Sequence, residues 1–249
     1  MKKGKVMFDR DQFNKEKQSN IEKAFQDKEL HDTALKFITK SDQYNYAYNW
    51  TWLGLPIIQM PEDIIIIQEI IWDCKPDVVI ETGIAWGGSV VLYASILEML
   101  GNGKVIAVDT VLPQKNIDQI MKYPFSKRID LVEGSSTDRS VVEQVKSKIK
   151  PGDTVMVILD SNHTHDHVFN ELLEYSELVT KGNYLVVSDT IVQEIPKQLH
   201  RPRSWGHGNN PRTAVDAFLQ ENIERFSQNN QYNKKAINSF TRNGYLIRE

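Results

Sequence analysis

Four acidic side chains stand where apolar runs of the sequence end, and they are the best candidates for chemistry. Each follows a stretch of β-branched or other apolar residues that reads as a strand buried on both faces. The carboxyl ends of parallel strands lie at one edge of a sheet, and ligands bind in the crevice beyond it. One such acid is often only a helix cap, but four together predict a site. They are Glu81, Asp109, Asp160 and Asp189.

The second pair of acids predicts a metal site. Asp160 and Asp189 end strands that are adjacent in the expected order, so both carboxylates could bind one hard cation, Mg²⁺ or Mn²⁺. His163 lies three residues beyond Asp160 and is a candidate general base, because imidazole titrates near neutral pH. His165 and His167 follow at alternate positions, in a segment that also fits a plain surface loop. Catalytic roles are therefore assigned to Asp160 and His163.

The first pair of acids predicts a nucleoside site. A glycine-rich turn follows the first strand, and glycines allow a ligand to approach the main chain closely. Asp109 ends the next strand, where an acid can bind both ribose hydroxyls. A dinucleotide-binding fold uses the same device, although its G-x-G-x-x-G motif is absent. The candidate cofactor-binding residues are Asp109 and Asp160, with Glu81, Thr82, Gly83, Gly87, Gly88 and Ser89 in the first loop.

Alternating strands and helices must position these residues. Strands are expected at 78–80, 104–108, 129–132, 154–159 and 184–187, and helices at 61–74, 90–100, 140–150, 169–179 and 213–221. The segment 236–248 is expected to form a final antiparallel hairpin. This order predicts an α/β, Rossmann-like, doubly wound and mostly parallel sheet with helices on both faces.

The N-terminal part differs from this pattern and is expected to be an accessory extension. Residues 1–39 read as charged helix, and residues 41–60 alternate aromatic with polar side chains. The aromatic segment fits either a strand that packs on the core or a lid over the substrate. We divide the chain into residues 1–60, the helical and aromatic lid segment, and residues 61–249, the α/β domain. The extension could also bury surface in a homo-oligomer.

Composition narrows the class of protein. A formal net charge of -3 gives no reason to expect a nucleic-acid partner. The single cysteine, Cys74, cannot form an internal disulfide, and the apolar run 64–72 is too short to span a bilayer. A cytoplasmic protein without a transmembrane segment is expected.

Three motifs together resemble the cephalosporin hydroxylase/rhamnosyl O-methyltransferase family. They are Glu81–Ser89, Leu159–His165 and Trp205–Val215, and the similarity extends from about Trp50 to the C-terminus. The resemblance implies a class I methyltransferase fold, S-adenosylmethionine, a divalent metal, and a pathway for surface polysaccharides or natural products. It also implies that Ser135 and Ser136 lie near the adenine, although both fit a helix N-terminus equally well.

One departure from related metal-dependent methyltransferases concerns the second aspartate. Those enzymes carry a third acid or amide beside it, whereas Asp189 is flanked by Ser188 and Thr190, which are weaker ligands. This places the metal in doubt unless water completes its shell.

The Gly-, Pro- and Asn-rich segment 201–211 is interpreted either as a connection or as a substrate loop. In the second interpretation Trp205 stacks on a sugar, while Asn209 or Asn210 donates hydrogen bonds to it. His165 is included among the candidate substrate contacts.

These features together predict an S-adenosylmethionine-dependent, metal-assisted O-methyltransferase. Its acceptor is expected to be a hydroxyl of a sugar or a glycosylated small molecule. Two alternatives stay open: a nicotinamide-dependent oxidoreductase, which would use Asp109 in the same way, and a non-catalytic scaffold that retains the fold.

Overall fold

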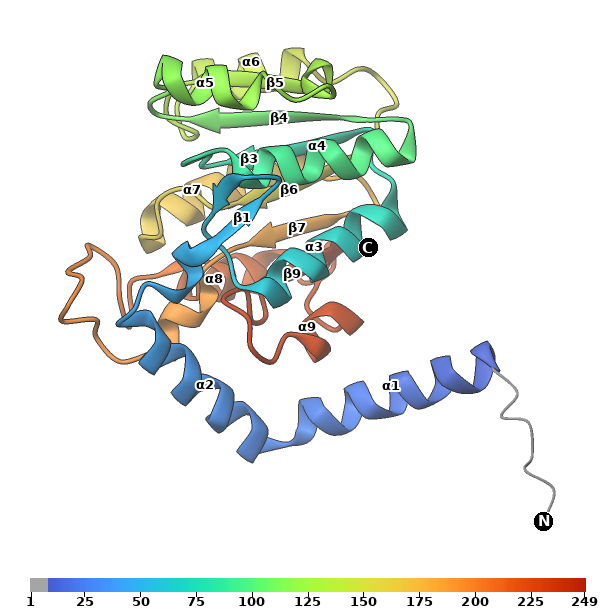
Figure 1. The fold of residues 1–249 in the computed structure, drawn as a ribbon, viewed down its shortest axis with the longest axis vertical. Helices are drawn as coiled ribbons and strands as arrows, with labels where there is room; N and C mark the ends of the chain where they lie inside the picture. Colours follow the sequence, from blue (N-terminus) through green and yellow to red (C-terminus); the bar gives the residue numbers. More distant parts are fainter. Residues whose placement is uncertain (1–8) are drawn as a thin grey trace.

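The computed structural model describes residues 9–249 and centres on a seven-stranded sheet in the order β5-β4-β3-β6-β7-β9-β8 (Figure 1). The strands β3 to β7 of this sheet are parallel, as expected, and the direction of winding reverses between β3 and β6. The strands are β3 (Val78–Thr82), β4 (Lys104–Asp109), β5 (Ile129–Glu133), β6 (Val155–Leu159), β7 (Tyr184–Val187), β8 (Phe226–Ser227) and β9 (Tyr245–Arg248).

Both faces of the sheet are covered, because successive strand residues point into two separate cores. Val79 and Met156 belong to the core under α3 (Pro61–Cys74), α4 (Gly88–Leu100) and α5 (Gln114–Ile120). Val78 and Val155 belong to the core under α6 (Arg139–Ser147), α7 (His165–Tyr175) and α8 (Pro211–Asn222). The expected Rossmann-like, doubly wound fold is confirmed, and its strands are apolar without alternation because each face is buried.

The C-terminal hairpin prediction was wrong in its boundaries. The antiparallel pair is β8 with β9, and the short helix α9 (Gln231–Lys235) lies between them in sequence. β9 enters the sheet between β7 and β8, antiparallel to both. The helix expected at 169–179 begins earlier, at His165, and α5 had not been expected at all.

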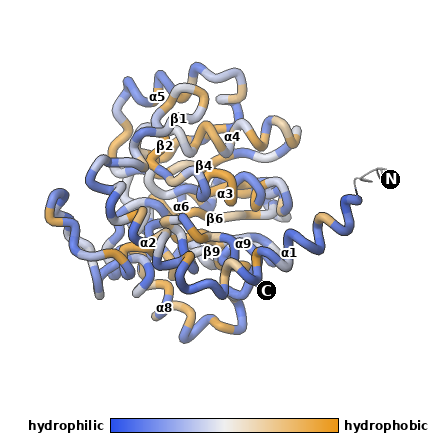
Figure 2. Tube along the Cα trace, turned by 60° about the horizontal axis from the view of Figure 1, so that its bottom comes forward, coloured by the Kyte–Doolittle hydropathy of each residue, from blue (hydrophilic) through white to orange (hydrophobic). Residues whose placement is uncertain are grey.

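The N-terminal extension begins with α1 (Arg10–Gln26) and α2 (Lys28–Asp42), while the part of the expected helix before residue 9 lies outside the described residues. α1 runs outward from the sheet, is mostly hydrophilic and has no buried residue (Figures 1 and 2). It is held against α9 by an ion pair of Glu22 with Lys234 at 2.6 Å. No helix in residues 9–249 is long and apolar enough to cross a membrane.

The aromatic segment packs on the domain. The turn η1 (Tyr46–Asn49) leads into an antiparallel pair, β1 (Trp50–Trp52) and β2 (Leu55–Ile57). The indole Nε1 of Trp52 donates a hydrogen bond to Ser95 Oγ on α4, at 3.1 Å. The structure therefore supports the packing interpretation for this pair of strands, whereas Tyr48 remains 41% exposed beside a cavity described below.

We expect Asp63→Ala to lower the free energy of unfolding by about 3 kcal/mol, because it leaves buried donors without an acceptor. The Asp63 carboxylate lies in the first turn of α3 and accepts hydrogen bonds from Ser239 Oγ at 2.5 Å, Tyr245 Oη at 2.7 Å and Phe240 N at 2.8 Å. Urea denaturation followed by circular dichroism measures the change. The control is Asp118→Ala, which removes an exposed acid and should change stability by less than about 0.5 kcal/mol.

Candidate active site

Two of the predicted acids converge with a histidine at the carboxyl edge of the sheet. Asp160 follows β6, Asp189 follows β7 after one residue, and His163 lies in the loop that leads into α7. Ligand atoms of the three side chains all lie within 4.8 Å of one another, and His163 Nε2 is 3.2 Å from Asp189 Oδ2. Two carboxylates and one imidazole form a donor set that a divalent cation can use.

Electrostatics at this position favour a bound cation. Burial raises the pKa of Asp160 well above its usual value, and the negative charges of Asp189 and Glu81 raise it further. An ionised Asp160 is therefore costly in the protein alone, and a nearby positive charge would offset that cost.

The third residue of this cluster is not a neighbour of Asp189 in sequence. Thr190 turns away and donates a hydrogen bond from Oγ1 to the carbonyl oxygen of Arg242, at 2.7 Å. His163 reaches the two carboxylates from the loop after β6. The sequence had indicated His163 as a base, and the structure adds that it is also within reach as a ligand.

Glu81 lies on β3, beside β6, and has no well-formed hydrogen bond within the described part of the chain. Its side chain is fully buried, and neither carboxylate oxygen has a partner of good geometry among residues 9–249, although the hydroxyls of Ser89 and Tyr93 lie near enough to lower its pKa. Burial raises the pKa of Glu81 to about 8. Unpaired buried carboxylates are rare, so this one is a candidate for binding a cationic group of a ligand.

The glycines of the first loop allow neighbouring parts of the protein to pack closely against it, whereas the sequence had suggested that they let a ligand approach the main chain. A Cβ atom on Gly83, where φ is +88°, would lie 2.1 Å from the carbonyl oxygen of Asp160. A Cβ on Gly88 would lie 2.2 Å from the carbonyl oxygen of Pro56, and one on Gly87 would lie 2.5 Å from Ile120 Cδ1. These glycines therefore let the end of β6, the strand β2 and α5 approach the loop. Thr82 and Ser89, also expected to contact the cofactor, are both buried.

Asp109 lines a cavity of about 280 Å³ and keeps one oxygen available to it. Its Oδ2 accepts hydrogen bonds from the loop amides of Ile84 at 2.7 Å and Ala85 at 3.2 Å. Its Oδ1 has only long contacts, at 3.3 Å to Thr110 Oγ1 and 3.4 Å to Val111 N. The cavity wall includes Gly83, Asp109, Gly134, Ser136, His167 and Trp205.

Of the two serines expected near the adenine, the structure places one on this cavity. Ser136 lines it and approaches His167 Nε2 at 3.2 Å, whereas Ser135 pairs with Thr137 at 3.0 Å between the hydroxyl oxygens. Asp138, rather than a serine, is the residue before α6.

A polar network on this wall was missed by sequence reasoning. Ser161 Oγ donates to Glu171 Oε1 at 2.7 Å and lies 3.0 Å from His167 Nε2, which also contacts Ser136. Glu171 is fully buried. The available signal was the spacing of His167 and Glu171, which are four residues apart and so share one face of a helix.

The predicted substrate residues of the loop before α8 differ in whether their side chains reach the site or bond to the protein itself. Trp205 packs edge-on against His163, with ring centroids 4.9 Å apart, and thus reaches the site. Asn209 Oδ1 accepts from the amide of His165 at 2.8 Å, and the His165 ring contacts Thr213 Oγ1 at 2.8 Å. Asn210 is fully buried and caps α8, so it cannot touch a substrate in this conformation.

Comparison with known proteins identifies the family. A family model described as rhamnosyl O-methyltransferase/CmcI matches residues 44–249. The chain belongs to this family. The family's rhamnosyl O-methyltransferase of Mycobacterium leprae is 31% identical over 210 residues, covering 82% of this chain and 86% of the relative. That of Mycobacterium tuberculosis H37Rv is 32% identical over 205 residues, covering 80% and 78%.

Solved structures of the rhamnosyl O-methyltransferase/CmcI type and of other O-methyltransferases share the fold. A CmcI structure with magnesium and S-adenosylmethionine gives a TM-score of 0.58 at 18% identity, covering 81% of this chain and 77% of that one. An O-methyltransferase of Bacillus cereus with SAH gives 0.50 at 12% identity, covering 81% and 82%. This member of the family is an S-adenosylmethionine-dependent O-methyltransferase, which decides against the nicotinamide-dependent alternative.

Proposed function

We propose that this methyltransferase uses a divalent cation, Mg²⁺ or Mn²⁺, to methylate a hydroxyl group of a sugar or of a glycosylated small molecule. The observation that carries the proposal is the convergence of Asp160, His163 and Asp189 within 4.8 Å. The names of the mycobacterial relatives, rhamnosyl O-methyltransferases, support a sugar acceptor. Trp205 beside His163 provides an aromatic face of the kind that stacks on sugar rings. An enzyme of this kind would act in surface-polysaccharide or natural-product biosynthesis.

The residues on the cavity wall fit the methyl donor. Asp109 Oδ1 is available to ribose hydroxyls, and Ser136 and His167 offer polar contacts further along the same wall. Glu81 offers a buried carboxylate to the cationic end of the donor. Each of these groups has an oxygen or nitrogen that the protein leaves unpaired or only weakly paired.

The chemistry needs the acceptor hydroxyl to lose a proton while it attacks the methyl carbon. A bound cation supplies Lewis acidity that lowers the pKa of that hydroxyl. The neutral imidazole of His163 accepts the proton, and Asp189 Oδ2, 3.2 Å from its Nε2, stabilises the resulting imidazolium. The new C–O bond forms as the C–S bond breaks, and sulfur keeps the electron pair, so that S-adenosylhomocysteine leaves. The site holds both reactants in line, which can contribute roughly 7–11 kcal/mol.

His163→Gln tests whether this histidine is the base. We expect methyl transfer to fall about 10² to 10⁴-fold and the acidic limb of the pH–rate profile to disappear, because glutamine cannot accept the proton. Mn²⁺ affinity, measured by electron paramagnetic resonance, should stay within about threefold because both carboxylates remain.

A different result would assign His163 to the metal. If His163→Gln lowers Mn²⁺ affinity as strongly as loss of an aspartate does, the histidine is a ligand and not the base. His207→Gln serves as the control, since His207 is an exposed histidine of the loop before α8. In His207→Gln, the rate of methyl transfer and the Mn²⁺ affinity should both match those of the unmodified protein.

The proposed function is tested in two stages. Calorimetry with S-adenosylmethionine and with NAD should show binding of the first alone. Mass spectrometry of reactions with methyl rhamnoside, methyl glucoside and glycosylated phenols, with Mg²⁺ or with a chelator, should then show a methylated glycoside only when metal is present. Transfer that proceeds equally well with metal and with the chelator would contradict the proposed role of the cation.

A further inference from the structure

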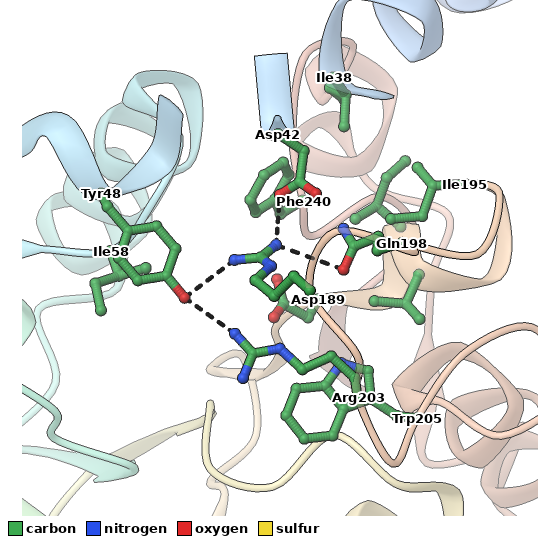
Figure 3. A pocket seen from close by; sticks show the side chains of 13 residues that line it. Ile38, Asp42, Tyr48, Ile58, Asp189, Ile195, Gln198, Arg203, Trp205 and Phe240 are labelled. Carbon is green, nitrogen blue, oxygen red and sulfur yellow. Dashed lines mark hydrogen bonds and ion pairs between the residues drawn. The ribbon is translucent and has the colours of Figure 1, made fainter. Parts of the chain in front are cut away.

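Two arginines converge on one phenol oxygen beside the proposed active site. Arg201 Nη1 and Arg203 Nη2 both donate to Tyr48 Oη, at 3.1 and 3.3 Å (Figure 3). Tyr48 comes from the N-terminal extension, whereas both arginines come from the segment between β7 and α8. The contact therefore joins two distant parts of the sequence over one cavity.

The positive charge of this cluster is only partly balanced. Asp42 forms ion pairs with Arg201 and, at 2.9 Å, with His200. Arg203 has no ion-pair partner within residues 9–249, and its guanidinium lies over the Trp205 ring, 5.2 Å from the centroid. Tyr48 thus holds two guanidinium groups close together, and the carboxylate paired with one of them is that of Asp42. An additional anion would lower the repulsion between the two guanidinium groups.

The cluster faces the cavity that reaches the proposed metal site. Asp189 and Trp205 line that cavity together with Tyr48, Arg201 and Arg203 (Figure 3). A neighbouring cavity of about 470 Å³ shares both arginines and Trp205. A molecule whose hydroxyl lies at Asp189 would therefore extend past the Trp205 ring toward the arginines.

We propose that the acceptor carries an oxyanion, a carboxylate or a phosphate group, which Arg203 binds with support from Arg201 and Tyr48. This inference rests on the proposed function and narrows its substrate class to acidic sugars, either uronates or sugar phosphates. A guanidinium binds both groups through two parallel hydrogen bonds, and the Trp205 ring holds the guanidinium plane in position. The free O–H of Tyr48 supplies a further donor, because its oxygen only accepts from the arginines.

The test compares ligands that differ in one group. Methyl α-glucuronide and glucose 6-phosphate carry the two anions, and methyl α-glucoside is the neutral counterpart. Each is titrated by ligand-observed NMR against the 249-residue protein with S-adenosylhomocysteine and Mg²⁺ present. We expect at least one anionic sugar to bind about tenfold or more tightly than the glucoside, with an affinity that falls as salt rises. Which of the two binds identifies the anion.

Matched variants assign the effect to Arg203. Arg203→Gln should remove the preference for the anionic sugar while leaving glucoside binding within twofold, and Arg203→Lys should retain only part of it, since lysine lacks the planar fork. Lys181→Gln is the control, because it removes the same charge from an exposed residue that lines neither of the two cavities.

Three results would overturn the inference: equal binding of neutral and anionic sugars, no binding of either anion, or equal effects of Arg203→Gln and Lys181→Gln. Calorimetry with S-adenosylmethionine, on the same proteins without S-adenosylhomocysteine, distinguishes failure of this inference from failure of the proposed function. Donor binding that persists without anion preference removes only the acidic acceptor, whereas loss of donor binding in the unmodified protein removes the proposed function as well.

Discussion

Asp160→Asn is expected to weaken Mn²⁺ binding by at least about 100-fold, which corresponds to roughly 2.7 kcal/mol. Methyl transfer should fall about 10³-fold, because the acceptor hydroxyl loses the Lewis acid that lowers its pKa. Asparagine has nearly the same shape as aspartate, so the loop should keep its conformation. Electron paramagnetic resonance measures the first quantity and product formation the second.

Stability provides the diagnostic that separates lost function from misfolding in this variant. Burial, with Asp189 and Glu81, raises the pKa of Asp160 well above its usual value, so its ionised form destabilises the protein alone at neutral pH. Replacement by a neutral side chain should therefore leave the free energy of unfolding unchanged or increase it. Asp166→Asn, at an exposed acid in the first turn of α7, should leave metal affinity unchanged. Undiminished Mn²⁺ binding in Asp160→Asn would refute the proposed metal site.

Glu81→Gln is expected to weaken S-adenosylmethionine binding about 100-fold at pH 8.5, since a buried charge-assisted contact contributes roughly 1.5–3 kcal/mol. The effect should shrink as pH falls. Burial raises the pKa of Glu81 to about 8, so at pH 6.5 its carboxyl group is mostly protonated before the donor binds. Calorimetric titration at several pH values measures both affinities.

The direction of the pH dependence follows from proton release. A positively charged ligand lowers the pKa of Glu81 in the complex, so binding expels a proton whenever the pH lies below about 8. Donor affinity should rise by up to about tenfold per pH unit between pH 6 and 8, and then level off. Binding enthalpies in buffers of different ionisation enthalpy should show the released proton. If Glu81→Gln shows the same pH dependence of donor affinity and the same proton release, another group supplies the proton.

The sheet and the acids at its edge were predictable from local sequence. Buried parallel strands are continuous apolar runs, and this pattern alone located β3 to β7 and the four acids at or near the ends of β3, β4, β6 and β7. Short elements were less visible. The two residues of β8 carry no periodicity, and β9 takes its place between β7 and β8 through backbone pairing that no local pattern encodes.

Distances between segments required the tertiary structure. The sequence placed His163 near Asp160, but only the fold brings its Nε2 to 3.2 Å from Asp189 Oδ2, which follows α7 and β7 further along the chain. Likewise, Asn210 is polar and lies in a loop, which suits a substrate contact as well as a helix cap. Because the structure buries Asn210 completely, its side-chain amide must find hydrogen-bond partners within the protein, and it caps α8.

The sequence by itself determined which residues reach the carboxyl edge of the sheet, because strand burial and strand ends are local properties of composition. Only the tertiary structure decided which of them meet, why Gly83 and Gly88 are glycines, and how Tyr48 joins Arg201 and Arg203 from opposite ends of the chain. Contacts between segments far apart in sequence depend on how the layers pack, and packing is a property of the whole chain.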